Sequence, residues 1–173
     1  INLDAHSDYR RMEGRHSGNG FRYAHREGYL AKYTVIGLHE NYNAQDIIDE
    51  LKDDPDLAFY YFEDIFLRGK YTFVEILEKT ISRMAGRPTG LELDLDCIEG
   101  VLSSAITPCG ITTMQARTYI MECATALRPV YLHLTEGAMQ LADGRANTTT
   151  AKLVAYLVTD FIKAHKHKRS FFF

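Results

Sequence analysis

Asp4-Ala5-His6-Ser7-Asp8 directly follows a short apolar run and places two carboxylates and an imidazole at alternate positions. In an extended chain, residues two apart point to the same side. We therefore expect Asp4, His6 and Asp8 to converge, with the small Ala5 and Ser7 facing away. Such a set suits a hard or borderline divalent cation such as manganese. The alternative to a metal site is a polar strand end whose side chains cap a helix.

A second acidic cluster lies in a later apolar run, where Glu92, Asp94 and Asp96 alternate with leucines. Alternation puts these three carboxylates on one face of a strand. The alternative is a half-exposed strand with a solvated acidic face. In a strand buried on both sides, however, clustered carboxylates must be paired or bound to metal. Together with the first cluster, they supply enough ligands for a two-metal site.

Two further segments could bind a substrate. The segment from Gly14 to Arg22 combines glycines, two arginines, a histidine, a hydroxyl and an amide, as in a binding loop. A plain surface turn would look the same. Glu136 follows another apolar run and could pair with a cationic amidine or guanidine, although an ordinary strand-end glutamate is the alternative.

These residues are positioned by alternating strand and helix signals, which favour an α/β fold with a mostly parallel sheet. Open sheets of this kind bind ligands at the carboxyl ends of their strands. We expect one domain over residues 1–173, built as a three-layer α/β/α sandwich. The apolar stripes that face its core include Met114 and Ile162. The expected strands are 1–3, 33–38, 57–62, 90–95 and 129–134, and the expected helices are 43–52, 72–84, 112–127 and 148–164.

Composition excludes several other classes of protein. A net charge of -3 and a pI near 6.2 give no electrostatic case for nucleic acid. No apolar run is long enough to span a bilayer, and no signal-peptide pattern is present. The three cysteines have no C-x-x-C spacing, so we expect a reducing cytoplasm. The basic and aromatic tail from His165 is expected to be a frayed end that docks apolar rings.

The ordered motifs DAHSD, SGNGF, LDLD, TPCGIT and TEGA resemble the ureohydrolases, the family of arginase, agmatinase and formimidoylglutamase. The resemblance extends from Ile1 to about Ala164. The phrases EGRHSGNGFRYA and YLVTDFI look most like the formimidoylglutamase branch. A non-catalytic module of this family remains an alternative. An unrelated α/β-hydrolase is disfavoured because no G-x-S-x-G elbow is present.

The resemblance implies an arginase-like fold and two manganese ions. The positions that match the family's metal ligands are Asp4, His6, Asp8, Asp94 and Asp96, with Asp4 and Asp94 as the bridging carboxylates. The positions that match its substrate-binding residues are Ser17, Asn19, Thr107 and Glu136.

Three departures from the family pattern matter. The family has another histidine ligand in an upstream Gly-Gly-Asp-His segment, which this sequence lacks. Its Asp-x-Asp-x-x-Asp-Pro motif ends here in Glu99-Gly100, and Phe21 stands where arginases carry a proton-shuttling histidine. Because Ile1 already lies in an expected strand, we expect a missing upstream segment, and one open sheet edge. We expect the chain alone to be inactive and to be insoluble or oligomeric.

The implied reaction is the addition of activated water to the planar carbon of a C=N group. Asp8 would accept a proton and return it to the leaving amine, while Glu136 would hold the cationic nitrogen. Arg15, His16 and Arg22 could receive the two carboxylates of formimidoylglutamate, a substrate of histidine degradation that gives glutamate and formamide. Agmatinase or arginase activity is the alternative. The expected partners are this small molecule and possible copies of the chain.

The sequence also predicts how the site behaves without metal. Four carboxylates around one imidazole should raise the pKa of at least one aspartate and that of His6. The cause we expect is repulsion between neighbouring anions. We expect Asp4 and Asp94 on adjacent or nearby strands, because short side chains must meet at shared ions.

Overall fold

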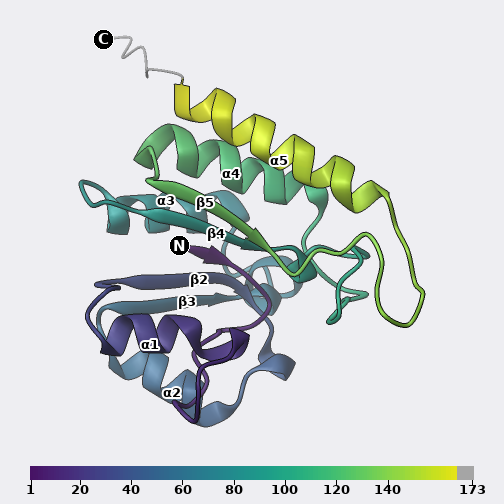
Figure 1. Ribbon diagram of the computed structural model, residues 1–173. Helices are drawn as coiled ribbons and strands as arrows, with labels where there is room; N and C mark the ends of the chain where they lie inside the picture. Colours follow the sequence, from purple (N-terminus) through teal and green to yellow (C-terminus); the bar gives the residue numbers. More distant parts are fainter. Residues whose placement is uncertain (167–173) are drawn as a thin grey trace.

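The computed structural model describes residues 1–166, so the aromatic end of the tail lies outside the described residues. Five strands form one sheet in the order β3-β2-β1-β4-β5, and every pair is parallel (Figure 1). The strands are β1 (Asn2–Leu3), β2 (Tyr33–Leu38), β3 (Leu57–Tyr61), β4 (Gly90–Asp94) and β5 (Tyr131–Thr135). The expected parallel sheet is confirmed, with β1 at its centre.

Helices cover both faces of this sheet and confirm the three-layer α/β architecture (Figure 1). One layer holds α1 (Gly20–Arg26) and α2 (Gln45–Asp53), whose apolar side chains pack with β2 and β3. The other holds α3 (Phe73–Met84), α4 (Thr113–Leu127) and α5 (Thr149–Lys166), which share a second core with β1 and β4. Short 3₁₀ helices span Ser17–Asn19, Glu40–Tyr42 and Leu95–Cys97, and a short π-helix spans Glu63–Leu67.

Local sequence explains where the long helices begin. Thr72 and Thr112 cap α3 and α4, each in a capping box completed by Glu75 or Gln115. Each box satisfies backbone donors that a helix start leaves unpaired. Two expected core residues are wrong, however: Met114 is 63% exposed and Ile162 is 47% exposed. Other members of the same expected stripes are buried, namely Ala116 and Ile120 on α4 and Leu153 and Leu157 on α5, and Tyr119 and Ala164 are buried beside them.

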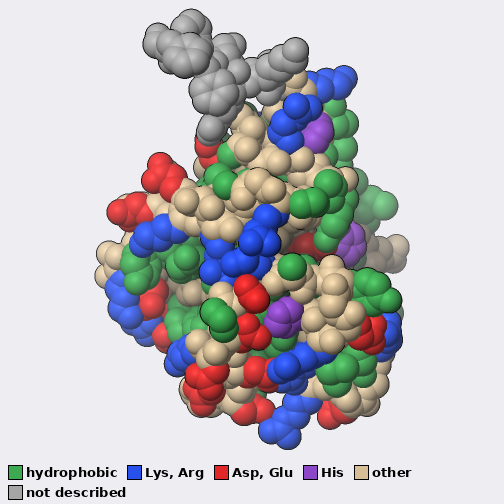
Figure 2. All heavy atoms as spheres, turned by 90° about the vertical axis from the view of Figure 1, so that its left-hand side faces the viewer, with side chains coloured by type: hydrophobic (Ala, Val, Ile, Leu, Met, Phe, Trp, Pro, Cys, Tyr) green, Lys and Arg blue, Asp and Glu red, His purple; other side chains and the backbone are tan. Residues whose placement is uncertain are grey.

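Sheet register brings the two acidic segments together. Asn2 pairs with Glu92 and Leu3 pairs with Leu93, so Asp4 and Asp94 follow side by side. The expectation that they follow neighbouring strands is confirmed. The opposite end of the sheet, where strands begin, faces the viewer in Figure 2, and Lys and Arg are interspersed there with Asp and Glu. Among residues 1–166, no helix is both long and apolar enough to cross a membrane.

Candidate metal centre

Five side chains converge where β1 and β4 end, and they form two groups that share one aspartate. Asp4, Asp8 and Asp94 offer oxygen atoms that all lie within 4.8 Å of one another. Asp4 also belongs to a second group with His6 and Asp96, within the same limit. A carboxylate common to two ligand groups is the arrangement that a bridged pair of cations requires.

The first segment converges by turning, so the expected extended geometry is wrong. β1 ends at Leu3, and the Asp4 carboxylate accepts a hydrogen bond from the backbone N–H of His6 at 2.7 Å. Asp8 has a φ of 47°, in the left-handed region. Aspartate tolerates this region better than most residues. The turn divides the segment, because Asp8 faces Asp94 while His6 faces Asp96.

The second segment also departs from strand alternation. β4 ends at Asp94, and Asp96 lies in the 3₁₀ turn that follows. The Asp94 carboxylate caps this turn by accepting a hydrogen bond from the Asp96 N–H at 3.0 Å. Glu92 does not join either ligand group, since its carboxylate lies 2.5 Å from the Nδ1 of His133. The expected common face therefore holds for Glu92 and Asp94, which lie two residues apart on β4 and line one cavity, and it is wrong for Asp96, which lies in the turn.

Burial leaves these acids short of compensating charge. Desolvation, reinforced by neighbouring aspartates, raises the pKa of Asp94 to about 9 and that of Asp8 to about 7. Desolvation also raises the pKa of Asp4. Hydrogen bonds to Asp4 and Asp96 raise the pKa of His6 to about 10. The expected directions are confirmed, but burial contributes more to the aspartate shifts than like-charge repulsion does.

A divalent cation fits these residues. Asp96 has a buried carboxylate oxygen, Oδ1, that finds no hydrogen-bond partner in residues 1–166. Buried polar atoms are rarely left unpaired, because desolvating them without a partner is costly. The donors are carboxylate oxygens and an imidazole nitrogen, which suit manganese better than a soft metal. Bound cations would favour the ionised carboxylates and the neutral imidazole.

Two cavities open over this cluster and contain the expected substrate residues Ser17 and Glu136. Glu136, like Asp8, has a positive φ, at 60°. Strained backbone of this kind often accompanies functional positions. The first cavity, of about 340 Å³, is lined by side chains that include Asp4, Asp8, Asp94, Ser17, Phe21 and Glu136. The second, of about 180 Å³, is lined by His6, Asp8, Asp94, Asp96, Arg10, His16, Ser17 and Glu136 among others.

The structure does not bring Arg15 and Arg22 to these cavities. Residues 20–26 form helix α1, which the sequence analysis missed because the glycine-rich composition indicated a loop. Arg22 is buried on this helix in an ion pair with Glu50. Arg15 pairs with Glu27 at 2.6 Å on the surface. Arg10, which lies two residues after Asp8, lines the smaller of the two cavities.

Asn19 and Thr107 lie close to the site but bond to the backbone. The buried Asn19 amide donates to the carbonyls of Arg11 and Gly14 and accepts from the N–H of His16. The buried Thr107 hydroxyl donates to the Cys109 carbonyl at 2.9 Å. Both side chains therefore shape loops in this structure, and neither lines the two cavities over the cluster.

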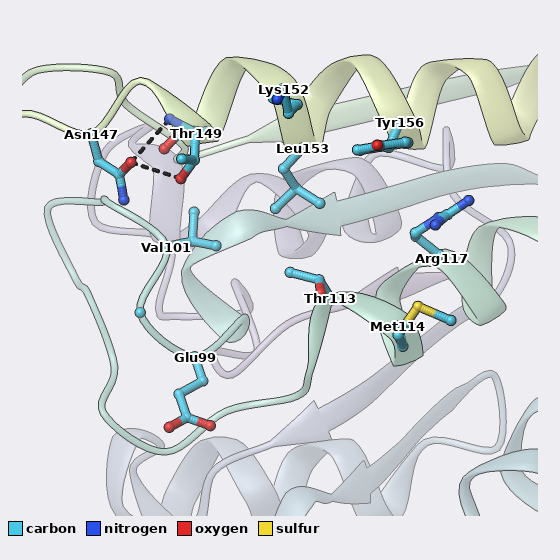
Figure 3. A pocket seen from close by; sticks show the side chains of 12 residues that line it. Glu99, Val101, Thr113, Met114, Arg117, Asn147, Thr149, Lys152, Leu153 and Tyr156 are labelled. Atoms are coloured by element: carbon cyan, nitrogen blue, oxygen red, sulfur yellow. Dashed lines mark hydrogen bonds between the residues drawn. The ribbon is translucent and has the colours of Figure 1, made fainter.

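A larger cavity lies elsewhere, between α4 and α5. It has a volume of about 400 Å³, and Figure 3 shows side chains of both helices facing across it. Its lining includes Glu99 and Arg117 but none of the expected site residues. Both potential metal groups found in residues 1–166 lie at the strand ends instead. Choosing a candidate site by cavity volume alone would therefore select the wrong region, because the largest of these three cavities contains none of the clustered residues.

Comparison with known proteins gives consistent results. The model of the arginase family matches residues 1–163. Formimidoylglutamase of Macrococcus caseolyticus is 31% identical over 171 residues, covering 96% of this chain and 51% of that protein. The chain thus spans about half the length of the curated relatives it matches. The crystal structure of Trypanosoma cruzi formiminoglutamase with Mn²⁺ aligns with a TM-score of 0.76 at 17% identity, covering 94% of this chain and 55% of that one. Proclavaminate amidino hydrolase of Streptomyces clavuligerus aligns with a TM-score of 0.75 at 18% identity, covering 95% and 54%.

Proposed function

The chain belongs to the arginase family, and from that premise we propose that it carries the metal and catalytic residues of a two-manganese hydrolase. The enzyme would add water to the C=N carbon of a linear amidine or guanidine. The observation that supports this proposal most strongly is the convergence of Asp4, His6, Asp8, Asp94 and Asp96 in two groups that share Asp4. Residues 1–173 would form a single catalytic domain portion.

The chain's own residues divide the chemistry between them. Two bound cations would lower the pKa of a coordinated water enough for it to act as a nucleophile near neutral pH. Asp8 belongs to the ligand cluster and lines both cavities, where it can accept the proton of the attacking water and return it to the leaving amine. Glu136 lines both cavities and holds the cationic nitrogen end by a charge-assisted hydrogen bond.

The proposed substrate is formimidoylglutamate, which would be hydrolysed to glutamate and formamide. Two relatives named formimidoylglutamase, from Macrococcus caseolyticus and Staphylococcus aureus, support the choice. The side chains proposed to bind its carboxylates are Arg10 and His16, because both line the smaller cavity over the cluster. Arg10 and His16 thus take the carboxylate-binding role that the sequence had suggested for Arg15, His16 and Arg22.

A second candidate is a cationic guanidine such as agmatine. The larger cavity over the cluster is lined by five carboxylates, and no lysine or arginine lines it. Such a cavity favours a positive substrate by electrostatics alone. The two candidates therefore make opposite predictions about the role of Arg10.

A substrate panel separates the candidates. The full-length protein, loaded with manganese, would be assayed with formimidoylglutamate, agmatine and arginine at equal concentrations. We expect a higher kcat/KM for formimidoylglutamate than for either guanidine. A preference for agmatine or arginine would refute formimidoylglutamate as the substrate, and absence of turnover with all three would refute the proposed activity on these substrates.

A further inference from the structure

The segment that follows β2 packs against the turn that carries His6. Asn43 donates from Nδ2 to the carbonyl of Ala5 at 3.2 Å and accepts at Oδ1 from the N–H of Ser7 at 2.9 Å. These two backbone groups lie immediately before and after His6. A second Nδ2 bond, to the carbonyl of His39 at 2.9 Å, ties Asn43 back to its own segment. Its amide orientation is fixed, because the nitrogen meets only carbonyls and the oxygen meets an N–H.

The ring of His6 is supported from the same segment. The Tyr42 ring stacks on His6 with centroids 5.2 Å apart and planes at 15°. Tyr42 also stacks on His39 at 4.9 Å and 6°, and His39 stacks on Phe62 at 4.6 Å. These separations are those of offset-stacked aromatic pairs. A column of rings therefore connects His6 to the buried Phe62.

We propose that Asn43 is a positioning residue for His6, with Tyr42 acting on the ring as Asn43 acts on the backbone. This inference rests on the proposed metal site. The backbone on both sides of His6 is held by one side chain, so loss of that side chain frees the imidazole to move away from Asp4 and Asp96. Groups outside the ligand set commonly orient metal ligands in this way.

Few other contacts hold the His6 side chain. Its Nδ1 lies 3.5 Å from Asp4 and 3.4 Å from Asp96, and the side chain is 24% exposed. Those two carboxylates are themselves proposed ligands, so they would turn toward a cation when it binds. Asn43 and Tyr42 contact His6 or its backbone neighbours without belonging to either ligand group. They are suited to define the imidazole position before metal arrives.

The test is a double-mutant comparison of manganese affinity, measured by titration calorimetry on the full-length protein. Asn43→Ala should weaken binding by about 10- to 100-fold, the usual loss when a group supporting a ligand is removed. In a His6→Ala background the same change should have little further effect, because the group it positions is gone. Asn41→Ala is the matched control, since Asn41 is exposed in the same turn and its side chain makes no hydrogen bond within residues 1–166. It should bind manganese like the wild type.

The outcomes distinguish this inference from the proposed function. A wild-type protein that binds no manganese overturns both. Normal wild-type binding with an unchanged Asn43→Ala variant, or an equal loss in both backgrounds, refutes only the positioning role. Tyr42→Phe should keep the affinity and Tyr42→Leu should lower it, because only the first retains the stacked ring. Thermal unfolding without metal checks that each variant is folded.

Discussion

The ligand cluster at the ends of β1 and β4 and the cavity between α4 and α5, called the groove below, differ in whether their charged side chains are paired. The groove is larger, yet its Arg117 is matched by Asp160, with Nε donating to Oδ2 at 2.6 Å (Figure 3 labels Arg117). Apolar Val101 and Leu153 contribute to its walls. The strand ends instead bring four aspartates together, two of them with a pKa several units above the ordinary value.

The difference shows that uncompensated charge identifies this site better than cavity volume does. Holding like charges together opposes folding, and a fold that does so at buried positions is suited to a cation. The groove has no comparable cost, because its arginine is already paired. Changes at the cluster should therefore alter metal binding strongly, and changes in the groove should alter it little.

The largest effect is expected from Asp94→Asn. It removes one carboxylate of the proposed bridging pair, so manganese affinity should fall by more than about 100-fold, beyond the loss typical of a supporting residue. Glu99→Gln is the matched control, because it removes one negative charge from the groove lining. Calorimetric titration would measure both variants. Equal manganese affinities of the two variants would contradict the proposal that metal binding depends on the cluster and not on the groove.

The pH dependence of stability gives the next test. Folded protein without metal keeps protons on Asp8 and Asp94 up to about pH 7 and about pH 9, whereas an unfolded aspartate loses them near 3.8. His6, raised to about 10, acts in the same direction. Stability in chelator should consequently fall as pH rises from about 5 to about 8. Thermal unfolding would show this.

The same experiment has an internal control. Asp94→Asn should flatten the pH dependence and stabilise the metal-free protein at about pH 8, because a neutral amide has no proton to lose. Saturating manganese should stabilise the wild type most at the higher pH, since protons compete with the metal. A melting temperature in chelator that rises over this range, with no difference between wild type and variant, would show that the aspartates are ordinary.

A smaller effect is expected at Arg10, which lines the smaller cavity over the cluster. Arg10→Gln should raise the KM for formimidoylglutamate by about tenfold and leave that for agmatine unchanged or lower, because one charge-assisted hydrogen bond is lost. Arg11→Gln is the comparison, since Arg11 binds Asp46 at 2.8 Å instead. Steady-state kinetics would decide. A similar KM in both variants would remove Arg10 from the substrate site.

The smallest effect should come from the groove itself. Met114 is exposed on its rim, so Met114→Ala should change stability by no more than about 0.5 kcal/mol and leave manganese affinity unchanged. Chemical denaturation and calorimetry would test both statements. A loss of metal binding would show that the groove and the cluster are energetically coupled, contrary to the independence proposed for them.

The sequence predicted the repeating parts of the fold better than the turns. The parallel strands, the helices that begin near Thr72 and Thr112 and the three-layer order follow from local pattern, which tertiary packing reinforces here. The paths of Asp8 and Asp96 did not follow, because both leave the strand geometry on which alternation depends. The Arg22 position failed for a different reason: composition indicated a loop, while packing against Glu50 holds it on a helix.

We propose that the cluster at the ends of β1 and β4 holds manganese. The most direct measurement is the metal content and affinity of the full-length protein after chelation and reloading, by elemental analysis and calorimetry. We expect about two manganese ions per chain, both lost when Asp4 is changed to Asn, since Asp4 is common to the two ligand groups. Absence of bound manganese in the wild type, or full loading of the Asp4→Asn variant, would contradict it.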